Sequence, residues 1–169
     1  MKESNVSSGS AKLGKGSLLV VNLRGLVNTR TPVSKTLEQL KLLRRFNATI
    51  VPDNEVYRGM LESAKEHIAW CKLENTIAEK LLSQKLEISN GRKVTPQDLS
   101  EEFGLSSFSE LAERLVAGEA RLGGTPRVRQ FFRLGPPRGG FKRSTRRQFG
   151  QGGILGPNKE LGKIVEVMI

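Results

Sequence analysis

Residues able to carry out catalysis are few in this sequence. His67 is the only histidine and falls within a helical pattern among charged neighbours, which is typical of a structural histidine. Cys71 is the only cysteine, so it has no cysteine partner for a zinc site or a disulfide. Four carboxylates fall on helical faces and are typical of solvent charges rather than a paired acid and base: Glu101, Glu102, Glu110 and Glu113. The sequence therefore predicts no enzyme, no catalytic residue, no metal site and no cofactor.

One glycine-rich run, GQGGILG at 150–156, is a candidate for a phosphate-binding loop. Such loops normally follow a hydrophobic strand and end in Lys-Ser or Lys-Thr, and this run has neither feature. A flexible linker is the commoner meaning of the pattern. A nucleotide-dependent enzyme built on this run is kept as an alternative.

Arginine is the residue type with the clearest chemical implication. The chain has 28 Lys and Arg against 17 Asp and Glu, so its net charge is +11 and its pI is near 10.2. Residues 1–70 carry 11 bases and 6 acids, residues 71–125 carry 7 and 9, and residues 126–169 carry 10 and 2. Between residues 125 and 147 there are eight cations and no acid: Arg127, Arg129, Arg133, Arg138, Lys142, Arg143, Arg146 and Arg147.

This distribution predicts a nucleic-acid partner. Solvated surfaces usually mix the two signs of charge, whereas a dense run of one sign repels itself unless an anion lies among its members. The planar guanidinium group also suits phosphates and base stacking better than an ammonium group. A membrane surface is disfavoured because the glycines and prolines of this segment prevent an amphipathic helix.

Length and composition are those of a globular protein of one domain with tails, or of two very small domains. The chain has 169 residues, of which 37% are hydrophobic and 5% aromatic. No apolar run approaches the ~18–20 residues of a membrane span, and residues 1–17 read as a flexible Ser/Gly/Lys arm rather than a signal peptide. We expect a reducing compartment because nothing suggests disulfide bonding.

The elements that must position the arginines begin with a β-α-β unit. The segment 18–24 alternates as a strand with one dry and one wetter face, a helix is expected over 34–46, and a short strand over 48–51. Asp53 or Asn54 can cap a second helix whose apolar positions continue to Ile68, with Trp70 near its end. Gly59 inside that helix costs about 1 kcal/mol relative to alanine, so a close approach of a ligand or another backbone is expected there.

The remaining elements predict a helical insert and one more strand. Helices are expected over 75–86, 96–103 and 107–116, with a turn at Asn90-Gly91, then a strand over 127–134 and a short helix over 158–168. The fold class is therefore α+β, a β-α-β-α-β core with a three-stranded sheet, two helices on one face and a helical insert before the last strand. The predicted divisions are an arm at 1–17, a split core at 18–71 and 127–142, the insert at 72–126 and a basic, glycine-rich extension at 143–169.

The uncovered face of such a sheet would be the RNA-binding surface. On the last strand Arg127, Arg129, Phe131 and Arg133 alternate onto one face, with Asn22 and Arg24 on the corresponding face of the first strand. Arginine can pair with phosphates there, and Phe131 can stack on a base. The alternative is that Phe131 simply packs against the helical insert. The segment PPRGGFKRSTRRQ at 136–148 would thread along a phosphate-rich groove and become ordered only on binding.

Three motifs, in this order, resemble one family. VNLRG at 21–25, VPDNEVYRGML at 51–61 and FRLGPPRGGFK at 132–142 are similar to the large-subunit ribosomal protein family called L-thirty, or L-seven in the eukaryotic cytosol. The similarity runs from about Ser17 to the C-terminus. The helical block before residue 126 resembles the longer archaeal and eukaryotic form, and the short Ser-rich arm favours the archaeal type.

The resemblance implies a ferredoxin-like core, no catalytic activity and no cofactor. It implies large-subunit rRNA as the partner, a position near the 5S rRNA region at the central protuberance, neighbouring ribosomal proteins, a monomer within the ribosome and a cytoplasmic location. A free-standing RNA-binding regulator or chaperone is the alternative function. The predicted RNA-binding residues are Asn22, Arg24, Gly25, Arg30, Arg58, Gly59, Arg127, Arg129, Phe131, Arg133, Pro137, Arg138, Gly139, Gly140, Lys142, Arg143, Arg146 and Arg147.

Overall fold

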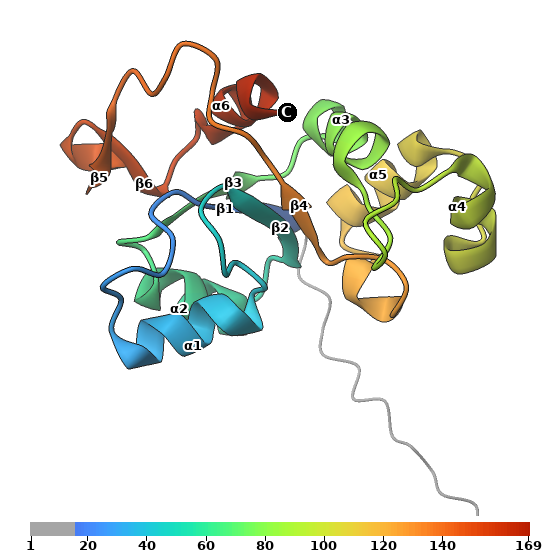
Figure 1. Ribbon diagram of the computed structural model, residues 1–169, viewed down its shortest axis with the longest axis horizontal. Helices are drawn as coiled ribbons and strands as arrows, with labels where there is room; N and C mark the ends of the chain where they lie inside the picture. Colours follow the sequence, from blue (N-terminus) through green and yellow to red (C-terminus); the bar gives the residue numbers. More distant parts are fainter. Residues whose placement is uncertain (1–15) are drawn as a thin grey trace, which may run out of the picture.

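A six-stranded mixed sheet with helices on both faces forms the centre of the molecule in a computed structural model that describes residues 16–169 (Figure 1). The strands are β1 Ser17–Asn22, β2 Asn47–Pro52, β3 Ile68–Lys72, β4 Phe131–Arg133, β5 Ser144–Gln148 and β6 Gly153–Pro157. The helices are α1 Thr31–Gln39, α2 Glu55–Ser63, α3 Asn75–Lys85, α4 Pro96–Phe103, α5 Phe108–Ala117 and α6 Leu161–Met168. The predicted arm at 1–17 falls almost wholly outside the described residues.

The strands follow the order β4-β2-β1-β3-β6-β5 across the sheet. The pairs β1·β2, β1·β3 and β2·β4 are antiparallel, and β6 joins β3 and β5 in parallel. The predicted α+β class is confirmed, but the sheet has twice the three strands that we expected. No helix among residues 16–169 is both long and apolar enough to cross a membrane.

The central strand β1 is buried on both faces. Leu19 and Val21 contribute to one hydrophobic cluster, with residues of α3, α5 and α6, while Leu18 and Val20 contribute to another, with residues of α1 and α2. The prediction of one wetter face is therefore wrong. A strand in the middle of a sheet that is covered on both sides is apolar at successive positions rather than at alternate ones.

Helices α1 and α2 cover one face of the sheet, as predicted (Figure 1). Helix α1 ends at Gln39, earlier than the predicted residue 46, and the chain then turns through Lys41 and Phe46, whose φ angles are +60° and +66°. Asn54 caps α2 by accepting a hydrogen bond from the amide of Tyr57 at 2.9 Å. That cap agrees with the prediction, because a side-chain oxygen there satisfies an otherwise unpaired amide.

The third strand of the core is β3, and the sequence prediction missed it. Helix α2 ends at Ser63, and Ile68 and Trp70, predicted to continue that helix, lie instead in β3, opposite Asn22 and Val20 of β1. The β-α-β-α-β run is thus complete at Lys72, before the insert. The predicted strand at 127–134 shortens to the three-residue β4, which pairs with β2 at the outer edge of the sheet.

The other face of the sheet is covered by the insert and by the C-terminal helix (Figure 1). Helices α3, α4 and α5 lie where they were predicted, to within a residue or two. Thr95 begins α4 with a capping box, in which its side chain and that of Asp98 each bond the other's backbone amide. Ser107 caps α5 by accepting a single hydrogen bond from the amide of Glu110 at 3.3 Å.

The glycine-rich segment is part of the sheet. Residues 153–157 form β6, in which Ile154 and Leu155 are buried. The glycine-rich run is therefore neither a flexible linker nor a phosphate-binding loop. A Cβ atom on Gly153 would collide with the backbone carbonyl of Arg147 in the neighbouring β5. Glycine therefore allows β5 and β6 to lie side by side.

We expect Cys71 to react slowly in the folded protein. It lies in β3 opposite Leu19, and burial, together with nearby Glu74, raises the pKa of its thiol to about 11. Because the thiolate is the reactive form, alkylation by iodoacetamide at pH 8 should be slower than in the urea-unfolded chain by on the order of 100-fold. Mass spectrometry of timed samples measures both rates. Equal rates in the two states would contradict the partly buried placement of Cys71.

Candidate nucleic-acid interface

The sheet face that we predicted to bind RNA is not open. The side chains on one face of β1 pack with residues of α3, α5 and α6, and those on the other face pack with residues of α1 and α2. The central strands therefore have no uncovered face. Asn22 is fully buried: its amide donates to the carbonyl of Leu42 at 2.8 Å, and its Oδ1 accepts from the amides of Arg24 and Gly25 at 3.1 and 2.8 Å. Asn22 therefore builds the turn after β1, and its predicted place on an exposed surface is wrong.

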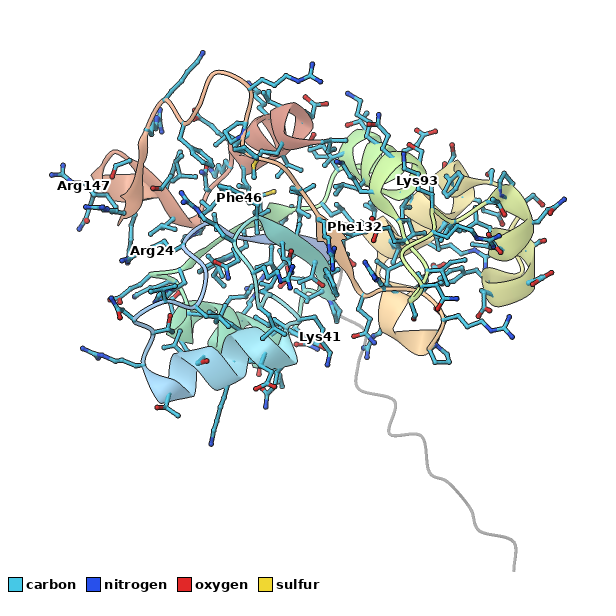
Figure 2. The ribbon with its side chains drawn as sticks, viewed as in Figure 1. Arg24, Lys41, Phe46, Lys93, Phe132 and Arg147 are labelled. Atoms are coloured by element: carbon cyan, nitrogen blue, oxygen red, sulfur yellow. The ribbon has the colours of Figure 1, made fainter. Side chains whose placement is uncertain are left out.

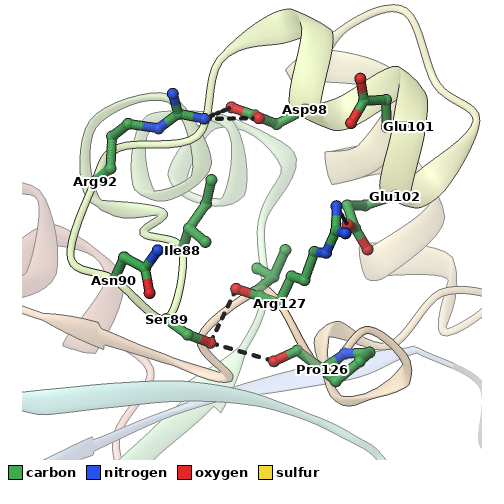
Figure 3. A pocket seen from close by; sticks show the side chains of 10 residues that line it. Ile88, Ser89, Asn90, Arg92, Asp98, Glu101, Glu102, Pro126 and Arg127 are labelled. Carbon is green, nitrogen blue, oxygen red and sulfur yellow. Dashed lines mark hydrogen bonds and ion pairs between the residues drawn. The ribbon is translucent and has the colours of Figure 1, made fainter.

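Two arginines before β4 are held by the insert. Arg127 lies 3.3 Å from a carboxylate oxygen of Glu102, and Arg129 pairs with Glu87 and donates to the carbonyl of Ser89 at 3.2 Å. Arg127 and Glu102 both line a hollow of about 580 Å³. Figure 3 shows the Arg127 side chain reaching to Glu102. Two carboxylates of the insert thus neutralise Arg127 and Arg129, which were both predicted to bind RNA.

Phe131 is positioned by the same contacts. Its side chain is half-buried, and the guanidinium of Arg129 lies 6.0 Å from its ring centre. This arrangement favours the alternative that Phe131 packs on the insert side of the molecule, since Arg129 is itself tied to Glu87. Arg133, at the end of β4, is exposed and belongs to none of the ion pairs within residues 16–169.

The loop after β1 presents Arg24 and Arg30 at the surface. Gly25 has a φ of +77°, which suits the turn that Asn22 stabilises. One guanidinium nitrogen of Arg24 donates to the carbonyl of Glu66 at 3.2 Å, next to His67. His67 is buried, and burial and the Arg24 charge both lower the pKa of its imidazole.

The start of α2 presents Arg58 and Gly59. Arg58 donates to both carboxylate oxygens of Asp53, at 2.5 and 2.8 Å, and these hydrogen bonds hold the pKa of Asp53 below its usual value. The Arg58 side chain is nevertheless 65% exposed, so the pair fixes its direction and leaves part of the guanidinium facing solvent. Gly59 is exposed, and nothing in the described chain lies within 4 Å of where its Cβ would be.

Gly59 gives a test that separates folding from binding. We expect Gly59→Ala to raise the free energy of unfolding of the free protein by about 1 kcal/mol, because alanine favours the helix and meets no clash. If rRNA approaches α2 here, as predicted, the same change should weaken association with the large subunit. Urea denaturation and sedimentation with subunits measure the two effects. Unchanged association would remove Gly59 from the binding set.

The densest group of exposed cations is in the C-terminal segment 138–147. Five of the eight cations between residues 125 and 147 are exposed and take part in no ion pair within the described chain: Arg133, Arg138, Lys142, Arg146 and Arg147. Of the other three, Arg127 and Arg129 pair with the insert and Arg143 lies 3.5 Å from Glu160. The prediction that residues 144–147 are ordered only by a partner is wrong, since they form β5 at the edge of the sheet.

This segment and the loop after β1 lie toward the same end of the molecule's long axis. Figure 2 shows Arg24 and Arg147 toward that end, which also carries β5, whereas Lys93 lies toward the insert. The segment 126–169 contains 10 bases and 2 acids, against 7 and 9 in residues 71–125. Arg127 and Arg129 of that segment lie against the insert and offset its excess of acids, so the molecule has one strongly basic end and one end close to neutral. The basic end can attract a polyanion.

Comparison with known proteins fits this arrangement. The family model described as "Ribosomal protein L30p/L7e" matches residues 18–68. A curated protein of Nitrosopumilus maritimus, "Large ribosomal subunit protein uL30", is 42% identical over 153 residues, which are 90% of this chain and 98% of that protein. This chain belongs to the uL30 family.

Other uL30 proteins support the assignment. That of Ignicoccus hospitalis is 38% identical, covering 85% of this chain and 91% of its own length, and that of Cenarchaeum symbiosum is 36% identical, covering 91% and 99%. The uL30 family is a structural, non-enzymatic component of the large ribosomal subunit. The resemblance predicted from the three motifs and the absence of an enzymatic role are therefore confirmed. Residues 16–169 contain no group of three or more side chains that could hold a metal ion.

Sequence reasoning missed the contribution of α6 to the basic end. Lys163, Ile164 and Val167 of this helix line a hollow together with Arg138 and Phe141. The C-terminal helix itself was predicted, but not its packing beside the 137–143 loop. That packing follows from the two parallel pairings of β6, which no local pattern in the sequence indicates.

Proposed function

We propose that this chain is a structural constituent of the large ribosomal subunit that binds and stabilises large-subunit rRNA through its basic end. The observation that carries this proposal is the group of five exposed cations in the segment 133–147 that form no ion pair within the described chain. Phosphates are the partner that such arginines suit best. Membership of the uL30 family supports rRNA as the source of those phosphates.

The proposed binding surface is the segment 138–147, with the loop that carries Arg24 and Arg30 and the start of α2. Pro137, also predicted to bind RNA, is buried. Positive φ angles of +82° and +76° at Gly139 and Gly140, with no atom near their Cβ positions, let RNA approach the backbone closely. The surface replaces the open sheet face of the sequence prediction. Arg127 and Arg129 serve instead to fix the insert against the core.

The position in the subunit is proposed from the family. We place the chain, as a single copy in the cytoplasmic ribosome, near the 5S rRNA region and beside other ribosomal proteins. The insert lies at the other end of the long axis from β5, so it is free to face a neighbouring protein while the basic end faces rRNA (Figure 1).

Sedimentation with large subunits at increasing salt tests the proposed function. A subunit constituent should remain with the large subunit when KCl is raised from 50 to about 500 mM, because many contacts hold it in place. A free-standing regulator or chaperone, which binds transiently, should be released as its phosphate contacts weaken. Release of the whole population at low salt would therefore contradict a structural role.

A further inference from the structure

The hollow between α6 and the 137–143 loop has the size and lining of a ligand site. Its volume is about 480 Å³, within the ~300–1,000 Å³ of small-molecule sites. Its lining includes a group of apolar side chains and a group of basic side chains. Its only carboxylate, Glu160, already lies 3.5 Å from Arg143, another lining residue.

The apolar side offers a stacking surface. Phe141 lines the hollow, is partly exposed, and stacks on Phe46 with ring centres 6.0 Å apart and an angle of 29° between the rings. The guanidinium of Arg45 also lies over the Phe46 ring, 4.7 Å from its centre. Val167 of α6, which also lines the hollow, is 47% exposed although it is aliphatic. A flat apolar group placed here would cover both side chains.

The basic side is suited to phosphate. Arg138, Lys142 and Lys163 line the hollow, are exposed, and form no ion pair within residues 16–169. Asn158 is not available to a ligand, because its amide donates to the carbonyl of Ile154 at 3.1 Å and its Oδ1 accepts from the amide of Glu160 at 2.8 Å. The lining therefore provides charge and stacking, and little direct reading of base edges.

We propose that this hollow receives one unpaired nucleobase of RNA, which stacks against Phe141 and Val167 while Arg138, Lys142 and Lys163 hold the adjoining phosphates. This inference rests on the proposed function and adds a site for an unstacked nucleotide. Aromatic stacking with cationic support is a common mode of binding single-stranded RNA, and it tolerates any base.

Two RNA probes of equal charge test the site. The full-length chain is titrated with a nine-nucleotide oligouridylate and with the same backbone lacking bases. We expect the oligouridylate to bind at least about fivefold more tightly, the lower end of the effect of one stacked base. Phe141→Leu and Val167→Ser should each reduce that ratio toward one without changing the dependence of binding on salt. Leu43→Ser, which alters an aliphatic side chain that is likewise 47% exposed and lies outside the proposed binding surface, is the matched control.

The outcomes separate this inference from the proposed function. Equal affinity for both probes, with wild-type sedimentation intact, overturns the base site and leaves rRNA binding in place. Failure to sediment with large subunits contradicts the proposed function itself. A glutamate-rich peptide is also tested as a competitor. If it displaces the oligouridylate, and binds the Val167→Ser variant more weakly than the wild type, the base site is overturned in favour of a protein partner. Photocrosslinking of 4-thiouridine to the peptide containing Phe141 or Val167 supports it.

Discussion

Replacing Phe132 by alanine is expected to lower the free energy of unfolding by about 3–5 kcal/mol. Phe132 is the largest of the fully buried side chains and lies at the centre of β4, opposite Ala48 of β2. It packs in the cluster that also includes side chains of α3, α5 and α6. Because β4 has only three residues, its pairing with β2 is short, and burial of Phe132 is expected to contribute much of its attachment. Truncation would leave a cavity among elements that come from three separate parts of the chain.

Urea denaturation followed by circular dichroism measures this loss. Phe131→Ala is the matched control, since Phe131 precedes Phe132 on the same strand and is only half-buried. Phe131→Ala should lower the free energy of unfolding by clearly less than Phe132→Ala. A domain of this size has a total stability of about 5–15 kcal/mol, so the Phe132 variant should be close to unfolding at 37 °C. A loss below about 1 kcal/mol would show that β4 is not anchored through this side chain.

Much of the secondary structure could be predicted because its signals are local. Thr95-Pro96 and Ser107 begin helices where they were expected, since a cap acts on amides only two or three residues away. The positions of β1 and of the short β2 were also recognisable. Local chemistry of this kind does not depend on what the rest of the chain does.

The errors arose where packing decides between two local possibilities. Ile68 lies four residues after Ala64, which fits a helix, yet the chain leaves α2 at Ser63 and pairs Ile68 with Asn22. Such a short apolar segment fits both the periodicity of a helix and that of a strand, and here pairing with β1 makes it a strand. The predicted RNA face failed for the same reason. Arg127 and Arg129 alternate as an exposed face would, but Glu102 and Glu87 of the insert lie against them.

The C-terminal region shows the limit of reading glycines from sequence. A glycine-rich run is usually flexible, but Gly153 is required by the close approach of Arg147 in the neighbouring strand. Burial of Ile154 and Leu155 then fixes β6 in the sheet. The cations of the segment 138–147 are thus held on a folded scaffold, which should reduce the entropy lost when they bind RNA.

Replacing Arg138, Arg146 and Arg147 together by alanine is expected to weaken RNA association by roughly 100-fold at 150 mM salt, since each loses a charge-assisted contact. The slope of log affinity against log salt should become shallower by about two to three units, because three phosphate contacts no longer release counterions. All three side chains are exposed and form no ion pair in the described chain, so the free energy of unfolding should not change. Filter binding to large-subunit rRNA between 50 and 400 mM KCl measures both quantities.

The matched control removes the same three charges at the other end of the molecule, in Lys85→Ala, Lys93→Ala and Arg121→Ala. Lys93 lies toward the insert in Figure 2, away from Arg147. If net charge alone drives association, both triple variants will lose the same affinity and the same slope, because long-range attraction depends on the total charge. If phosphates contact the basic end directly, the slope of log affinity against log salt will become shallower in the arginine variant only. Equal losses would therefore reject the proposed interface while leaving a general electrostatic attraction, and a loss confined to the arginine variant would place rRNA along β5 and the 137–143 loop.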